Sequence, residues 1–275
     1  MEKEEFLKKL EVELKISKNS KYTIRNYVRA NLELLNFVKK RPEEITIDDV
    51  KAYQAEKLSD KASKTIVLFL SAIRYAYSNI LQKDPTIGIK RPKKEIKIPT
   101  VLTKEEVRAL IDSIENKKSK LMISLTYACG FRVSELLNLK IKDLNFEEKI
   151  GYVRQSKGRK DRIFNIPDSL LGLLKKQAQG QKEKNEEYLF TGKKGPLSDR
   201  NLQKIVRKAA KKAGLSKQVH PHTLRHSFAT HLLENDTDIR VIQELLGHAD
   251  LNTTQIYTHI SPEQIKKVKS PLDNL

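Results

Sequence analysis

Residues 220–259 of the chain read HPHTLRHSFATHLLENDTDIRVIQELLGHADLNTTQIYTH and contain all six of its histidines. Scattered core histidines would not segregate in this way. The pattern is helical from residue 168 to the end, and on a helix His222, Arg225 and His226 share one face. Two imidazoles around one guanidinium form a surface rich in hydrogen-bond donors, which suits a phosphate. A helix whose histidines form hydrogen bonds in the interior is the alternative.

A second stretch suited to chemistry is GFRVSELLNL, residues 130–139. Gly130 predicts the end of one helix and a turn of the chain, and Arg132 then begins the next helix. Glu135 follows three residues later and can hold the Arg132 guanidinium in one orientation. Taken alone, the two residues could also form an ordinary ion pair within a helix, worth a few tenths of a kcal/mol.

A third stretch, SKGRKDR at residues 156–162, lies between two predicted strands. Gly158 permits a tight turn, so the stretch is predicted to form the tip of a hairpin with Lys157 at its edge. A lysine held against DNA there can donate a proton to a leaving oxygen. A charged tip that is simply solvated is the alternative.

The fourth stretch is LGHADLNTTQIYTH, residues 246–259. Gly247 predicts the end of a helix, with His248 in the turn and Tyr257 in a short helix beyond it. Because the chain has nine tyrosines, core packing explains one of them equally well. The stretch is therefore informative only together with the other three.

Zinc binding is a competing interpretation of the histidines, because His222 and His226 have the spacing of a two-histidine helical ligand pair. No glutamate lies between them, however, and no cysteine is nearby. Arg225 would place a fixed positive charge beside the metal. These features disfavour a metal site, and we expect neither a metal nor another cofactor.

The composition points to a polyanionic partner. The net charge is +19, and both the first 99 residues and the remainder are basic. Nucleic acid is the simplest such partner, although a lysine-rich proteome would also raise the charge. No apolar run is long enough to span a bilayer, and the first residues lack an apolar signal core. Cys129 is the only cysteine, so no intrachain disulfide can form, and we expect a cytoplasmic protein.

The first 84 residues are predicted to form a small all-α domain of four helices. The first helix covers the first 16 residues, and the second follows Ser20. Thr46 and Asp49 form a capping box for the third helix. The fourth helix is long and apolar, over residues 61–81.

Residues 85–100 are predicted to be a basic linker, because three prolines and five basic residues interrupt the helical pattern. A second domain, residues 101–275, opens with a capping box at Thr103 and Glu106. Its pattern changes to short β-rich runs that predict a small antiparallel sheet, at residues 144–146, 150–154 and 162–166. The predicted fold class is mainly α with this small antiparallel sheet.

Taken in order, the four stretches resemble the tyrosine recombinase (phage integrase) family, and the resemblance covers nearly the whole chain. It is carried by GFRVSELL, a hairpin lysine, HTLRHSFATHLL and LLGHADLNTTQIYTHI. The resemblance implies an N-terminal SAM-like core-binding domain that clamps DNA and a C-terminal α+β catalytic domain with a tail helix. Whether that tail packs in cis or in trans is left open.

The resemblance also implies a catalytic set, namely Arg132, Lys157, His222, Arg225, His248 and Tyr257. In such a set the two arginines clamp the scissile phosphate, and the lysine protonates the departing 5′ oxygen. The first histidine assists the nucleophile or binds a non-bridging oxygen, and the second contacts the phosphate. The tyrosine forms a 3′-phosphotyrosine. Glu135 and His226 are expected to support this set. Further candidates for DNA contact are Lys61, Lys64, Arg74, Arg159 and Lys160.

Within the family the chain looks most like the Xer branch, and most like archaeal Xer recombinases. This implies resolution of chromosome dimers during cell division, at a dif-like inverted repeat in double-stranded DNA, by a nucleoid-associated homo-tetramer that needs no metal or ATP. A plasmid or viral integrase, a non-catalytic DNA-binding protein, a type IB topoisomerase-like enzyme and a metal-dependent hydrolase are the alternatives.

Overall fold

The computed structural model describes residues 1–93, 99–154, 161–192 and 195–247. The chain divides into two compact units, Met1–Lys97 and Ile98–Leu275, and each is described by itself. No helix within the described ranges is long and apolar enough to cross a membrane.

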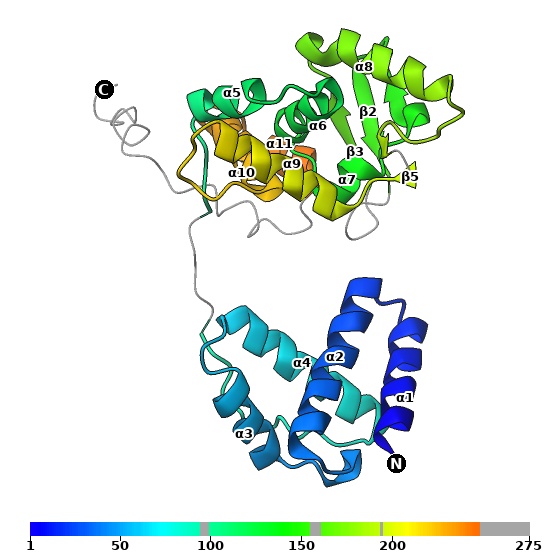
Figure 1. The fold of residues 1–275 in the computed structure, drawn as a ribbon, viewed down its shortest axis with the longest axis vertical. Helices are drawn as coiled ribbons and strands as arrows, with labels where there is room; N and C mark the ends of the chain where they lie inside the picture. The colour runs from blue at the N-terminus through cyan, green and yellow to red at the C-terminus, as the bar shows by residue number, and fades with distance from the viewer. Residues whose placement is uncertain (94–98, 155–160, 193–194, 248–275) are drawn as a thin grey trace, which may run out of the picture. The chain divides into compact units, whose positions relative to one another are not determined.

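The first unit is built from four α-helices and one short 3-10 helix (Figure 1): α1 (Lys3–Ile16), α2 (Lys21–Val38), η1 (Pro42–Glu44), α3 (Ile47–Lys57) and α4 (Ser63–Ile80). Side-chain caps explain where two of them begin. Ser20 accepts a hydrogen bond from the backbone N–H of Thr23, and Thr46 and Asp49 form the predicted capping box. The four predicted helices are confirmed, and α4 contributes more buried residues to their core than any of the other three.

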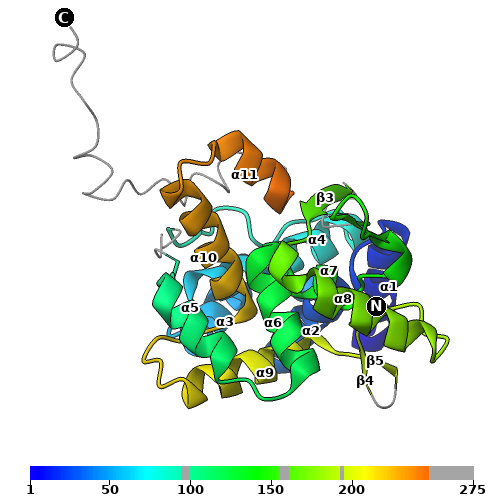
Figure 2. The same cartoon turned by 90° about the horizontal axis from the view of Figure 1, so that it is seen from above.

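The second unit is mostly helical and contains two small sheets. Its helices are α5 (Lys104–Asp112), α6 (Lys117–Ala128), α7 (Val133–Leu137), η2 (Ile141–Asp143), α8 (Asp168–Lys182), α9 (Asp199–Lys212), α10 (Pro221–Glu234) and α11 (Ile239–Leu246). Its strands are β1 (Leu144–Asn145), β2 (Ile150–Val153), β3 (Arg162–Asn165), β4 (Thr191–Gly192) and β5 (Gly195–Pro196). Helix α11 packs against both α10 and β3, as Figure 2 shows from above.

The predicted antiparallel sheet is confirmed, with strand order β1-β2-β3 and Gly151 opposite Phe164. The helical pattern predicted from residue 168 onward is wrong at one place, because β4 and β5 pair there as a second antiparallel sheet. Each of these strands has only two residues, which is too short for any periodicity to show in the sequence.

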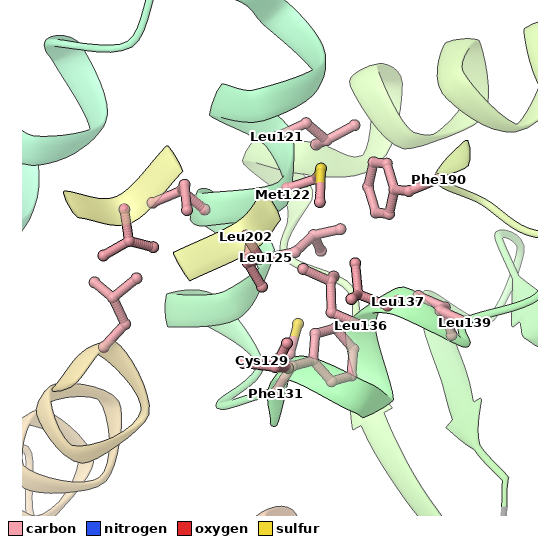
Figure 3. Packing of buried hydrophobic residues seen from close by; sticks show 14 of the residues in the cluster. Leu121, Met122, Leu125, Cys129, Phe131, Leu136, Leu137, Leu139, Phe190 and Leu202 are labelled. Carbon is pink, nitrogen blue, oxygen red and sulfur yellow. The ribbon is translucent and has the colours of Figure 1, made fainter. Parts of the chain in front are cut away.

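The core of the second unit lies around α6, whose residues 121–126 are all buried. Figure 3 shows Leu121, Met122 and Leu125 of this helix packed with Leu136 of α7 and with Phe190. Cys129 lies at the edge of this core and is 3% exposed. Its thiol donates to the Asn165 carbonyl at 3.4 Å, and burial raises its pKa to about 12. The core thereby fixes α6 and α7, which meet at the turn that carries Arg132.

Candidate active site

Helix α10 places Arg225 in the interior of the second unit. Pro221 stands in its first turn, where a missing N–H costs nothing, and the Thr223 hydroxyl accepts from the backbone N–H of His220 at 3.1 Å. The Arg225 side chain is 4% exposed. Its Nη1 donates to the Gly130 carbonyl and its Nη2 to the Leu246 carbonyl, both at 2.6 Å. These two bonds fix the orientation of the guanidinium.

Arg132 stands at the N-terminus of α7, where Glu135 caps the helix. The Glu135 carboxylate accepts from the backbone N–H of Arg132 at 3.0 Å and from its Nη1 at 2.5 Å. Glu135 is 3% exposed, whereas Arg132 is 19% exposed. The carboxylate thus anchors the guanidinium from inside and leaves its other side open to solvent.

Arg162 is a functional candidate that the sequence does not single out, because it appears there only as the last residue of the charged stretch 156–162 and the first residue of a predicted strand. It is 3% exposed, and its Nη2 donates to Oε2 of Glu135 at 2.7 Å. The signal for it lies in the alternation of β3. Phe164 points inward and Ile163 is exposed, so Arg162 occupies an inward position of the strand. A charged residue in the inward phase of a strand needs a buried partner.

Three arginines meet at the C-terminal end of α11, where each hydrogen-bonds a different one of three consecutive carbonyls. Arg162 donates to Leu245, Arg225 to Leu246 and Arg132 to Gly247, the last at 3.3 Å. Gly247 allows the chain to leave the helix here, because it adopts the left-handed conformation, with φ at 60°. The partial negative charge of a helix C-terminus favours these cations.

The cluster carries excess positive charge around one carboxylate. Arg132 and Arg162 hydrogen-bond Glu135, and Nη1 of Arg225 lies 3.6 Å from it, so three guanidiniums share a single negative charge. Burial by itself would raise the pKa of Glu135, but Arg162, the backbone N–H of Arg132 and the charge of Arg225 together lower it. Glu135 therefore stays ionised at neutral pH. The remaining two positive charges suit a phosphate, whose negative charge increases on nucleophilic attack.

The two histidines of α10 that flank Arg225 remain neutral near pH 7. His222 is exposed, but the protein around its ring still lowers its pKa, and the charges of Arg225 and Arg132 lower it further. Burial, His222 and Arg225 lower the pKa of His226 to about 4. A neutral imidazole at His222 can accept a proton or donate a hydrogen bond, so it can serve either role expected of it.

The structure brings Arg132, Glu135 and Arg225 into one cluster, with His222 close enough for their charges to act on it. The other residues predicted for catalysis or contact in this unit lie outside the described residues, namely Lys157, Arg159, Lys160, His248 and Tyr257. Their roles stay predictions, as do the chemical roles of the residues in the cluster.

The three DNA-contact candidates of the first unit are all exposed. Lys61 precedes α4 and Lys64 lies in its first turn, whereas Arg74 forms an ion pair with Asp84 at 3.3 Å. A DNA phosphate would have to compete with that carboxylate. DNA contact by these residues stays a prediction.

Within the described part of the chain, no three His, Cys, Asp or Glu side chains gather into a group that could hold a metal ion. His222 and His226 stand on α10 beside Arg225, whose charge opposes a cation. The donor set therefore fits an anion better than zinc.

Replacing Glu135 by glutamine is expected to lower the free energy of unfolding by roughly 3–5 kcal/mol, because buried Arg162 loses its countercharge. The measurement is guanidinium denaturation followed by circular dichroism. Glu115→Gln is the matched control, since Glu115 pairs with Lys212 on the surface and is 86% exposed. That exposed pair should contribute less than about 1 kcal/mol. Equal losses in both variants would contradict the buried role of Glu135.

The second unit is expected to lose stability as the pH falls below 6.5. In the unfolded chain His226 has its ordinary pKa near 6.5, but in the fold the pKa is about 4. Below pH 6.5 the unfolded state takes up a proton that the native state excludes, so up to about 3 kcal/mol is lost by pH 4. His226→Gln should show a smaller loss between pH 7 and pH 5 in denaturation experiments. An unchanged slope would contradict this assignment.

Comparison with known proteins extends these observations over both units. Residues 100–264 match the Phage integrase family, and residues 6–87 match the Phage integrase, N-terminal SAM-like domain. Tyrosine recombinase XerA of Pyrococcus horikoshii is 38% identical over 268 residues, which cover 96% of this chain and 90% of that protein.

Solved structures of Xer recombinases are also similar to this chain. A crystal structure of XerA recombinase is 32% identical, covers 96% of each chain and has a TM-score of 0.57. The pre-cleavage complex of XerH site-specific recombinase bound to difH substrate has a TM-score of 0.73 at 28% identity, covering 90% of this chain and 79% of that one. The arginine cluster thus lies in a chain that each of these proteins matches over at least 90% of its length.

Proposed function

Since the chain belongs to the phage integrase family and is a tyrosine recombinase of the Xer type, we propose that it resolves chromosome dimers by strand exchange at a dif-like site. The observation that carries the chemistry is the arginine cluster, in which three guanidiniums share one buried carboxylate. The similarity to XerH bound to difH supports the choice of DNA site.

In the proposed reaction the Tyr257 hydroxyl attacks the scissile phosphorus and gives up its proton, with neutral His222 assisting. The bond from phosphorus to the 5′ oxygen breaks, and Lys157 supplies a proton to that oxygen. Arg132 and Arg225 neutralise the charge that develops on the phosphate. The product is a 3′-phosphotyrosine and a free 5′ hydroxyl, and attack by a 5′ hydroxyl from another strand reverses the step.

The proposal includes independence from metal and ATP. A phosphodiester is exchanged for a phosphotyrosine ester, so the bond energy is kept and no external energy source is required. The proposed partner is double-stranded DNA with an inverted repeat. In the proposed exchange each protomer cuts one strand, and four cuts complete the exchange. We therefore propose that the protein acts on DNA as a homo-tetramer, at the nucleoid and during chromosome partition. His248 is proposed as a further contact to the scissile phosphate.

Covalent trapping tests the chemistry. A labelled DNA with a dif-like site carries a nick next to the cleavage position, so the cut fragment diffuses away and the covalent complex accumulates. Wild-type protein in EDTA without ATP should give a slow band on a denaturing gel, and mass spectrometry of the digest should locate the phosphate on a tyrosine. Tight binding without this band would favour a DNA-binding protein, and strand cleavage that gives no such band and that EDTA abolishes would favour a metal-dependent hydrolase.

A recombination assay tests the biological role. A supercoiled plasmid with two directly repeated dif-like sites should be converted into two circles. Relaxation of the plasmid without excision would favour a topoisomerase-like activity. Excision only with attachment sites of a plasmid or virus, and none with the chromosomal site, would favour the integrase alternative.

A further inference from the structure

Arg162 is a buried cation that the proposed reaction does not use. It lies on β3 with 3% of its side chain exposed, and its guanidinium carbon is 5.4 Å from the centre of the Phe131 ring. It donates to Glu135 and to the Leu245 carbonyl. Its Nε has no hydrogen-bond partner among the described residues.

Fold stability alone is a weak reason for such a residue. Taking a guanidinium out of water is costly, and buried ion pairs often contribute no more than well-packed apolar residues of the same size. The unpartnered Nε adds to this cost. The contacts of Arg162 therefore suggest a geometric role.

The two acceptors of Arg162 lie on α7 and α11, and both of these helices also supply hydrogen-bond acceptors to the catalytic arginines. Glu135 on α7 orients Arg132, and Leu245 lies in the last turn of α11, whose following carbonyls bind Arg225 and Arg132. The chain also passes close to Arg162 directly after α11, since a Cβ built on Gly247 would lie 3.0 Å from Cδ of Arg162. Arg162 thus joins α7 to the end of α11.

We propose that Arg162 is a positioning residue for strand cleavage, which holds Glu135 and the C-terminal turn of α11 together so that Arg132 and Arg225 keep one geometry. This role rests on the proposed function. The fork of the guanidinium is needed, because Nη1 and Nη2 reach acceptors on different elements. A lysine ammonium is a single point charge on a flexible stem and cannot reproduce both bonds in fixed directions.

Two residues of the predicted catalytic set follow Gly247 in the sequence. His248 is the next residue in the sequence, and Tyr257 follows ten positions after Gly247. The last described turn of α11 is therefore the anchor from which the chain continues to both. Loosening that turn is expected to reduce the cleavage rate while leaving DNA affinity nearly unchanged.

The test compares Arg162→Lys and Arg162→Met with Leu174→Ala. Leu174 is fully buried on α8, so its replacement destabilises the same unit without touching the arginine cluster. Two quantities are measured for each variant. One is the single-turnover rate of covalent complex formation at saturating protein, corrected for the folded fraction. The other is hydrogen–deuterium exchange of the α11 backbone amides.

Both Arg162 variants should cleave roughly 10- to 100-fold more slowly with nearly unchanged Kd, as is common when a supporting partner is lost. Exchange in the last turn of α11 should rise in Arg162→Met and stay at the wild-type level in Leu174→Ala. Unchanged exchange would overturn the positioning role, and so would faster exchange with a normal cleavage rate. If wild-type protein forms no covalent complex while exchange responds as expected, the proposed function fails and the contact is structural only.

Discussion

Replacing Tyr257 by phenylalanine is expected to abolish the covalent protein–DNA complex, with a loss on the order of 10⁴-fold or more. The substitution removes only the phenol oxygen, which is the atom that forms the phosphotyrosine bond in the proposed reaction. No neighbouring group can take its place without a different product. DNA binding should stay within about threefold of wild type, because phosphate contacts by basic residues dominate affinity.

The measurement is the nicked-substrate assay, with wild type and variant compared at equal DNA occupancy. Tyr188→Phe is the matched control, because Tyr188 is a half-buried tyrosine of the same unit that contacts Lys140. It should retain the wild-type rate. A covalent complex formed by Tyr257→Phe would place the nucleophile elsewhere.

The second large effect is expected for Arg225→Gln, which should slow single-turnover cleavage by about 10³-fold or more. Loss of one preorganised donor to a developing negative charge costs roughly 10²–10³-fold. Arg225 also hydrogen-bonds the Gly130 and Leu246 carbonyls, so its replacement removes these two backbone contacts as well as the positive charge. Arg225→Lys keeps the charge without the fork and should recover only part of the rate.

Binding and folding have to be measured beside that rate. Affinity should fall little, because Arg225 supplies one phosphate contact among many. Arg240→Gln is the control, since Arg240 is an exposed arginine on the neighbouring helix α11 and its replacement also removes one positive charge. It should stay within about twofold of the wild-type rate, as surface substitutions usually have small effects. A similar loss in both variants would point to general electrostatics instead of a clamp.

The helices could be predicted from the sequence because their signals are local. Ser20 and Thr46 cap helices within three residues of themselves, and the apolar spacing of residues 61–81 shows the buried face of α4. The contact of Arg132 with Glu135 is local in the same sense, since the two residues are one helical turn apart.

The rest of the cluster depends on contacts between distant parts of the chain. Arg225 bonds a carbonyl 95 residues away, and Arg162 bonds one 83 residues away. No spacing in the sequence encodes such pairs. The hydrophobicity of the first two residues of β3 is misleading, since Ile163 is exposed and Arg162 is buried, and only the phase of Phe164 indicates the inward face. The buried carboxylate of Glu135 outweighs the apolar preference at that position.

The lone thiol in the core of the second unit gives the protein a practical advantage for single-molecule work. Cys129 is shielded from solvent, and its raised pKa keeps it protonated at neutral pH. A maleimide dye should therefore ignore the native chain and react only with a cysteine introduced on its surface. Leu173 on α8, which is 54% exposed, is a suitable place for Leu173→Cys. Donor- and acceptor-labelled protomers would then report each step of assembly on DNA in real time, with no native residue removed from the core.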